Sequence, residues 1–539
     1  MKHKRSFILV LIGSLLLSAV SILSYVPTSI AEALGAQSSE ASSDTQYPVQ
    51  EVLIVGATDR NLAIQEQDNS HIHTEPSTGE SNERWRLSTS DGVYFQIINM
   101  NTNTPLSQYD LMAPTDSLDH VETDTSDDSQ LWQFVGADQD AYGDFYNYTI
   151  VSKNDSNLVL TEETSNNILT LSNYIGSTNQ KWKLNSSGIV GYAGFVEHNG
   201  KMKTGTIGGL LGETVEVRDY PSLKKALDDD LPRTIIVAAN IDLSVEPVVT
   251  KIGSNKTIIG SYAAHTLTNP RLITDDPYGV TGVSNNIILK NLNIEVDNRP
   301  GLINLSVYGS RNLWVDHCTF NSNMPVDVNE VGKYIWVNYS GNQDLDPDYY
   351  TISYSKFSNR YWAVTFGAKS IDQNNATVAY NYFDSCVRRT PETGNGRLHA
   401  LNNFIERDNS YEDRPYAAIL GAYEAHTYSE ANRFENFHKL STGYWDKELM
   451  STYVNDVGSY TDSGVTSTAT PYAYQTYATD VITSYNPSAD YSYKVIQAYD
   501  GVNGNDVKTF NTAHAGSVSN DTDLKYVEYP EFAHYLLHR

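Results

Sequence analysis

The second half of the chain repeats a short pattern, in which a turn with Asn or Ser leads into a brief apolar β run that closes near a large aromatic side chain. The phenylalanines of the clearest copies lie 21 to 37 residues apart, at Phe320, Phe357, Phe383, Phe404 and Phe434. Repeats of roughly 20 to 50 residues are typical of solenoids and propellers. A propeller needs about four strands per repeat and a longer, more even period. The pattern therefore predicts an all-β fold with a right-handed parallel β-helix, in which equivalent aromatic residues stack as a ladder.

The chain has two cysteines, Cys318 and Cys386, which lie close to Phe320 and Phe383. These two phenylalanines belong to coils that are two apart. With about 4.8 Å between neighbouring strands, the two sulfur atoms should be roughly 9 to 10 Å apart. A disulfide cannot span that distance, so we expect two free, mostly buried thiols.

The first half carries a different repeat, in which three tryptophans are spaced by 47 and 50 residues. Their settings are Glu83-Arg84-Trp85, Gln130-Leu131-Trp132 and Gln180-Lys181-Trp182. Alternating runs such as Tyr148-Thr149-Ile150-Val151 lie between Asn, Ser, Asp and Gly turns and indicate strands and hairpins. Because 539 residues exceed one ordinary core, we expect one all-β domain over residues 47–187 and a second over residues 188–539.

The N-terminus has the features of a secretory signal peptide over residues 1–33. A basic head, an apolar run and the A-x-A pattern Ala31-Glu32-Ala33 follow one another. The alternative is an uncleaved anchor helix, because the apolar run is near the length that spans a bilayer. Residues 34–46 contain four Ser and two Gln and are expected to be a flexible linker. We therefore expect a secreted protein, with no membrane association once the signal is cleaved.

A formal net charge of -28 argues against nucleic acid as a partner. Against this background, the stretch from Val387 to Asn403 places three arginines within ten residues, at Arg388, Arg389 and Arg397. An anionic substrate of so acidic a chain would need a local cationic site or a bridging cation. This stretch is the candidate for such a site.

Several stretches in the right order resemble the pectate lyase/pectin lyase superfamily, polysaccharide lyase family one. They are the Gly-rich opening 206–212 with Arg233-Thr234-Ile235-Ile236-Val237, then Asn312-Leu313-Trp314-Val315-Asp316-His317, the arginine segment, and the closing segment 491–516. The tryptophan repeats resemble the ricin-type lectin β-trefoil. The two resemblances together imply a β-helix lyase domain preceded by an N-terminal lectin-like trefoil. The stretches that match the sugar-binding positions of that lectin family lack its aspartate, so whether the trefoil binds sugar stays open.

The lyase resemblance implies cleavage of galacturonan by β-elimination, in which a base takes the C5 proton of a uronate and cations stabilise charge on its C6 oxygens. Placing the family motif without gaps puts its base arginine on Arg389. The motif's second arginine falls on Gly394, and Arg388 and Arg397 are then possible carboxylate partners. Trp362 stands where the family often has a lysine, and we assign it to substrate binding. His399 and Asp316 lie inside strand motifs, so we expect buried hydrogen-bonding roles for them.

The resemblance also implies calcium, but the positions of the usual carboxylates carry no acid. They read Pro300-Gly301-Leu302-Ile303-Asn304 and, later, Tyr334 and Asn338. Calcium prefers several anionic oxygens, so we name no metal ligands and no cofactor, and calcium remains only possible. Acidic runs at 327–330 and 344–348 are the one alternative source of ligands.

Three functions fit the sequence. The first is a secreted, monomeric lyase acting on pectin or a related galacturonan of the plant cell wall, with the trefoil as an accessory lectin. The missing acids fit either a calcium-independent enzyme that acts on methyl-esterified polymer or a degenerate site, and the sequence leaves the choice open. The second is a non-catalytic carbohydrate-binding or adhesion protein on a degenerate lyase scaffold. The third, a β-helix glycoside hydrolase, needs paired carboxylates, whereas the site stretches are rich in Arg and Tyr.

Overall fold

The computed structural model describes residues 45–59, 61–66, 72–112, 123–140, 143–198, 201–202, 205–244, 249–274, 284–308, 310–324, 332–338, 349–367, 374–394, 396–407, 418–422, 425–436, 453–461, 464–465 and 484–537. The expected signal peptide and most of the expected linker lie outside these residues, as do both acidic runs. No helix in the described ranges is long and apolar enough to cross a membrane.

The N-terminal strands form an antiparallel sheet that closes on itself, because β1 pairs with β10 at one edge and with β2 and β4 elsewhere. Its strands are β1 (Glu51–Gly56), β2 (Leu62–Glu66), β3 (Ile72–Pro76), β4 (Trp85–Ser88), β5 (Gln96–Asn99), β6 (Trp132–Gln139), β7 (Phe145–Ser152), β8 (Leu158–Glu163), β9 (Ile168–Asn173) and β10 (Trp182–Ser186). Short helices join them at η1 (Ser81–Glu83), α2 (Gln108–Met112), η2 (Asp128–Gln130) and η3 (Thr178–Gln180).

The three tryptophans of the first repeat occupy equivalent places in this barrel. Trp85, Trp132 and Trp182 are buried. Each indole N–H donates to a main-chain carbonyl 21, 26 or 22 residues earlier, those of Ile64, Leu106 and Leu160, at 3.0, 2.9 and 3.1 Å. Three copies of one local geometry therefore build the barrel core.

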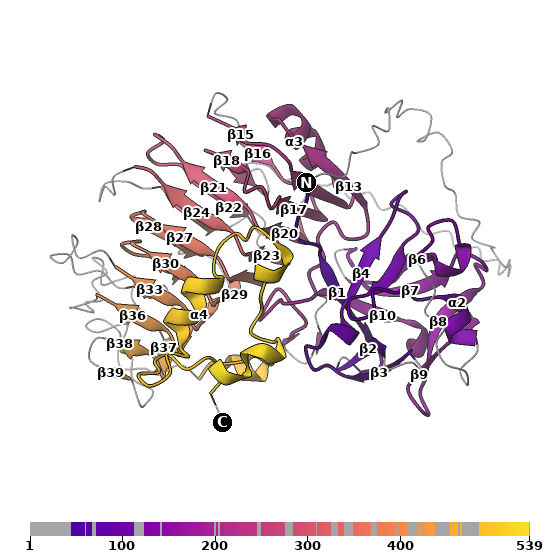
Figure 1. Cartoon of the computed structure of the whole chain (residues 1–539). Coiled ribbons are helices and arrows are strands. Elements are labelled where there is room, and N and C mark those ends of the chain that lie inside the picture. The colour runs from indigo at the N-terminus through magenta and orange to yellow at the C-terminus, as the bar shows by residue number, and fades with distance from the viewer. Residues whose placement is uncertain are drawn as a thin grey trace, which may run out of the picture. The chain divides into compact units, whose positions relative to one another are not determined.

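The rest of the chain winds into a parallel β-helix with three sheets (Figure 1). The first sheet contains β13 (Glu213–Val217), β14 (Arg233–Val237), β17 (Lys256–Gly260), β20 (Ile287–Lys290), β23 (Leu313–Asp316), β26 (Tyr349–Ser353), β29 (Asn374–Ala379), β32 (Gly396–Leu401), β35 (His426–Glu430) and β37 (Tyr453–Val457). The second contains β15 (Ile241–Asp242), β18 (Thr266–Thr268), β21 (Asn293–Val296), β24 (Thr319–Ser322), β27 (Lys356–Ser358), β30 (Tyr382–Asp384), β33 (Phe404–Glu406), β36 (Arg433–Glu435), β38 (Tyr460–Thr461) and β39 (Gly464–Val465), the last antiparallel to its neighbour. The third contains β16 (Thr250–Lys251), β19 (Leu272–Ile273), β22 (Ile303–Tyr308), β25 (Lys333–Asn338), β28 (Trp362–Phe366), β31 (Glu392–Gly394) and β34 (Leu420–Ala422).

Smaller elements flank the coils. These are β11 (Glu197–His198), β12 (Lys201–Met202), α3 (Tyr220–Leu227), η7 (Pro487–Ala489), α4 (Val507–His514), η8 (Asp521–Asp523) and η9 (Pro530–Tyr535). The predicted all-β class with a parallel β-helix is confirmed.

A two-residue turn joins the first sheet to the second in each central coil. Its first residue adopts a left-handed φ, for example 47° at Tyr354 and 49° at Asn402. Its second residue joins a buried hydrogen-bond ladder: the amide N–H of Ser355 donates to Asn381 Oδ1, that of Asn381 to Asn403 Oδ1, and that of Asn403 to Asn432 Oδ1. The Asn and Ser residues of the sequence repeat thus bind successive coils together.

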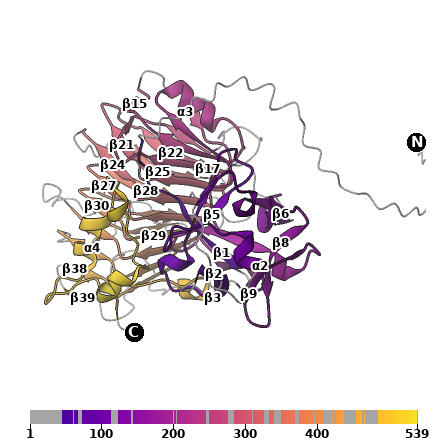
Figure 2. The same cartoon turned by 45° about the vertical axis from the view of Figure 1, so that its right-hand side comes forward.

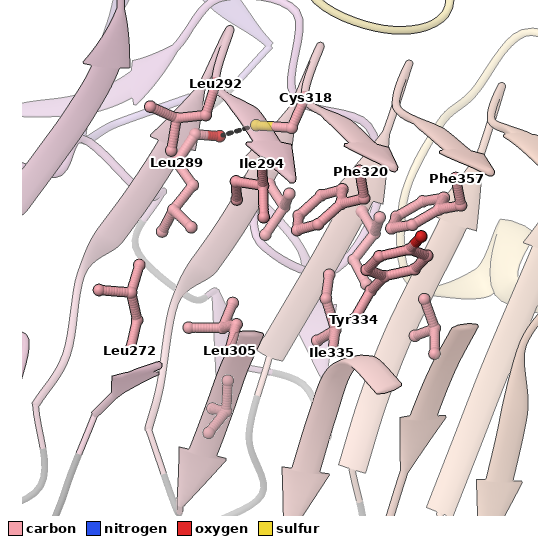
Figure 3. Close-up of a cluster of buried hydrophobic side chains, with 14 of the residues drawn as sticks. Leu272, Leu289, Leu292, Ile294, Leu305, Cys318, Phe320, Tyr334, Ile335 and Phe357 are labelled. Carbon is pink, nitrogen blue, oxygen red and sulfur yellow. Dashed lines mark hydrogen bonds between the residues drawn. The ribbon is translucent and has the colours of Figure 1, made fainter. Parts of the chain in front are cut away.

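The core side chain of each coil lies two residues after its hydrogen-bond ladder residue, for example Phe357 after Ser355 and Phe383 after Asn381. Ring centroids of Phe320 and Phe357 are 4.9 Å apart, and those of Phe357 and Phe383 are 5.0 Å apart. Figure 3 shows the first two rings side by side in the core. The prediction that Phe404 continues the ladder is wrong: Ile405 pairs with Phe383, while Phe404 pairs with Tyr382. The chain has Asn at both 402 and 403, and Asn403 takes the ladder position. The core position two residues later is therefore Ile405 instead of Phe404.

Both cysteines are free and buried, as predicted. Burial raises the pKa of Cys318 and of Cys386 to about 12. At neutral pH both groups therefore remain protonated thiols that pack in the core.

Asp456, in β37, gives the stability of the coils a pH dependence. It is fully buried and accepts a hydrogen bond of 2.6 Å from the Ser459 hydroxyl. Burial raises the pKa of Asp456 to about 6. A raised pKa in the folded state favours the protonated acid, so its stabilising contribution is complete at about pH 4 and is lost as pH rises through 6.

We expect Asp456→Asn, which cannot ionise, to stabilise the protein at pH 8 by about 1 to 3 kcal/mol. At pH 4 the variant and the wild type should unfold at similar temperatures. Thermal unfolding followed by tryptophan fluorescence at the two pH values measures this difference. An equal gain at both pH values would show that the charge of Asp456 is not its cause.

Candidate active site

The third sheet brings together stretches that are far apart in the sequence. Lys333, at the start of β25, pairs with Trp362 at the start of β28. Trp362 in turn forms a parallel bridge with Arg388, next to Arg389. β22, β25 and β28 lie side by side in Figure 2, in agreement with their pairing. Coil stacking therefore places Lys333, Trp362 and Arg389 on three successive coils.

Arg389 is held by three partners. Its Cζ lies 3.9 Å from the centroid of the Trp362 ring. Its Nε is 2.6 Å from a carboxylate oxygen of Glu392, and its Nη1 donates to the Thr365 hydroxyl at 3.4 Å. The backbone φ of Arg389 is 59°, in the left-handed region that residues with a side chain seldom adopt. Such a conformation, with the side chain only 11% exposed, fixes the guanidinium at the edge of the coil.

Lys333 is the second cation of this face. Its Nζ lies 4.7 Å from the centroid of Trp362 and 5.1 Å from that of Trp336. Burial lowers the pKa of Lys333 to about 8; the Arg389 guanidinium lowers it as well, and the Glu392 carboxylate opposes both. One indole, that of Trp362, therefore contacts both an ammonium and a guanidinium, as cation–π attraction favours.

Two further arginines lie behind these groups and are completely buried. Arg360 donates to the carbonyl of Leu302 at 2.6 Å and to Asn304 Oδ1 at 3.4 Å. Arg388, which the sequence assigned to substrate binding, is also completely buried, and burial lowers its pKa. A side chain in this position is not available to contact a polymer, so Arg388 adds positive charge beneath the site rather than a binding surface.

Arg397 lies in a different sheet from Arg389. It belongs to β32 of the first sheet, where its Nη1 is 3.4 Å from Asp490 Oδ2 and its Cζ is 5.7 Å from the centroid of Tyr485. β31 of the third sheet ends at Gly394, and β32 of the first sheet begins at Gly396. Of the four predicted site residues, the structure therefore brings Arg389 and Trp362 together and places Arg397 elsewhere.

The expected structural roles of His399 and Asp316 are confirmed. Both side chains are completely buried. His399 Nδ1 lies 2.7 Å from the Tyr491 hydroxyl, and Asp316 accepts a hydrogen bond of 2.7 Å from Tyr526. Burial alone would raise the pKa of Asp316, but the neighbouring His317 lowers it below its usual range.

Comparison with known proteins agrees with this architecture. A family model described as pectate lyase matches residues 183–520. The chain belongs to the pectate lyase family. A pectin lyase of Bacillus subtilis is 31% identical over 347 residues, which cover 62% of this chain and 89% of that protein. A pectin lyase of Pseudomonas marginalis is 30% identical over 248 residues, which cover 42% of this chain and 70% of that protein.

Among solved structures, a pectate lyase from Bacillus sp. N165 in complex with trigalacturonate matches with a TM-score of 0.46 and 22% identity. The match covers 62% of this chain and 99% of that one.

The calcium-binding positions of the pectate lyase family do not fit the metal in this chain. Asn304 Oδ1 accepts a hydrogen bond from Arg360, and its Nδ2 donates to the carbonyl of Pro270. Tyr334 is buried in the core and donates to the carbonyl of Ser358. Over the described ranges, no three His, Cys, Asp or Glu side chains are placed to hold a metal ion. Calcium prefers several anionic oxygens. These two positions offer only an amide oxygen that already accepts from Arg360 and a buried phenol.

Sequence reasoning missed three residues of this pectate lyase site: Lys333, Trp336 and Glu392. Glu392 lies within the arginine motif, three residues after Arg389, and could have been recognised as an ion-pair partner. Lys333 and Trp336 belong to no motif. Both residues lie in the stretch that carries Tyr334 and Asn338, where the family keeps its later acidic pair. That position is the one signal that could have pointed to them.

Proposed function

We propose that this pectate lyase family member cleaves methyl-esterified galacturonan by β-elimination, without calcium. The arrangement of Lys333, Trp362 and Arg389 carries the proposal, because it gathers two cations around an indole on which a sugar ring can stack. In the reaction the C5–H bond breaks and its proton passes to a base. A C4=C5 double bond forms, the C4–O4 bond breaks, and the departing oxygen takes a proton.

Positive charge near C6 is what this reaction needs most, because charge develops on the C6 oxygens as the C5 proton leaves. Lys333 and Arg389 supply that charge from the protein itself. The family resemblance assigns proton removal to Arg389. Its side chain is only 11% exposed, and the Trp362 ring and the Glu392 carboxylate hold the guanidinium in one orientation. Arg389 is thus the catalytic residue of the proposal, and Trp362 and Lys333 bind the uronate.

The test compares pectins of high and low methyl esterification, each with calcium and with a chelator, and follows the absorbance of the unsaturated product. We expect product on esterified pectin at the same rate with or without chelator. Lys333→Met should lower kcat/KM by about 10- to 100-fold, because it removes one of the two cations. Loss of activity in chelator would contradict calcium independence. Absence of product on every pectin, with binding retained, would instead support a non-catalytic carbohydrate-binding protein.

We further propose that the N-terminal barrel is a ricin-type β-trefoil that acts as an accessory lectin, and that the protein is secreted after cleavage near Ala33. The equivalent indole hydrogen bonds of Trp85, Trp132 and Trp182 support the threefold relation. Binding of the whole protein to immobilised cell-wall polysaccharides tests the lectin function. N-terminal sequencing of protein from the culture medium tests the cleavage.

A further inference from the structure

Glu392 places a negative charge directly beside the Arg389 guanidinium. Glu392 is only 5% exposed, and one of its carboxylate oxygens lies 2.6 Å from Arg389 Nε. Glu392 pairs in register with Thr365, whose hydroxyl accepts from the same guanidinium. Register and side-chain contacts therefore hold the carboxylate against the guanidinium.

We propose that Glu392 determines the substrate class of this site, by selecting methyl-esterified uronate over free uronate; the inference rests on the proposed lyase function. A free C6 carboxylate bound to Arg389 would lie next to a second, fixed carboxylate in a poorly hydrated site. Like charges placed together in this way are strongly unfavourable. A methyl ester carries no charge in the ground state and meets no such repulsion.

The ester still gains from the cations during the reaction. Negative charge appears on its C6 oxygens only in the transition state, where Arg389 and Lys333 stabilise it. Glu392 therefore acts mainly on the ground state of the charged substrate. Its removal should change the preference between the two polymers much more than the rate on the esterified one.

The experiment measures kcat/KM of the full-length protein on highly methyl-esterified pectin and on polygalacturonate, for wild type, Glu392→Gln and Glu392→Ala. The matched control is Glu216→Gln, which removes a carboxylate paired with Arg218 at 2.8 Å in β13. We expect the ratio of esterified to unesterified activity to fall at least about tenfold in both Glu392 variants. The ratio should stay unchanged in the control.

Calorimetric binding of trigalacturonate gives a second readout that does not depend on turnover. Its affinity should rise at least about tenfold in Glu392→Gln, and this result decides the matter if the variant is folded but inactive. An unchanged ratio and an unchanged affinity in a folded Glu392 variant would overturn the specificity role while leaving the lyase proposal intact. A wild type inactive on every pectin would instead overturn the lyase proposal itself.

Discussion

Arg389→Ala and Arg389→Lys are expected to lower kcat/KM on esterified pectin by at least about 100-fold, and by up to about 1,000-fold. The alanine variant removes the guanidinium from its place on Trp362. The lysine variant keeps a positive charge but loses the planar group that stacks on the indole and pairs with Glu392. Both losses should appear in kcat as well as in kcat/KM, because the group acts on the reacting uronate.

The matched control is Arg218→Lys, because the Arg218 side chain is 59% exposed and pairs with Glu216 at the far start of the coils. It should keep wild-type activity. Unfolding temperatures of all variants should match that of the wild type, which would show that the Arg389 side chain is not needed for folding. Rates within about threefold of wild type in both Arg389 variants would be incompatible with any direct role, since removal of such a group costs far more.

The coils of the β-helix could be predicted because each is specified locally. An Asn or Ser at a turn and an aromatic residue two positions later recur in several copies, as at Ser355 and Phe357 and at Asn381 and Phe383, and the structure uses both as ladders. The exact register between coils could not be predicted from the sequence. Either Asn402 or Asn403 fits the pattern, and only packing between coils selects Asn403 and, with it, Ile405.

The site could be predicted only where it coincides with a motif. The family pattern pointed to Arg389 and Trp362, which the structure brings into contact, and it grouped Arg397 with them because it is close to Arg389 in sequence. Arg397 belongs to β32 of the first sheet, whereas Gly394 ends β31 of the third sheet. Lys333 shows the opposite case: it lies 56 positions before Arg389, and the two meet only through the stacking of coils whose loops differ in length.

The asparagine ladder links successive coils through buried hydrogen bonds, and Asn403 is one of its middle members. The side chain is completely buried. Its Oδ1 accepts from the main-chain and side-chain amides of Asn381 at 3.2 and 3.0 Å. Its Nδ2 donates to the carbonyl of Val378 at 2.8 Å and to Asn432 Oδ1 at 3.0 Å. One side chain thus satisfies polar groups of both neighbouring coils.

Asn403→Ala is therefore expected to destabilise the protein by about 3 to 5 kcal/mol, because it leaves several buried donors and acceptors without partners. Asn403→Asp keeps the acceptor but replaces the donor amide by a carboxylate, so its destabilisation should grow as pH rises and the acid ionises. Thermal and urea unfolding of the full-length protein, at pH 5 and pH 8, measure both effects.

Asn323→Ala is the control, since Asn323 is exposed and its side chain makes one hydrogen bond, to Asp297. A change of less than about 0.5 kcal/mol is expected there. A comparably small effect at Asn403 would mean that the aromatic ladder, and not the amide ladder, holds the coils in register.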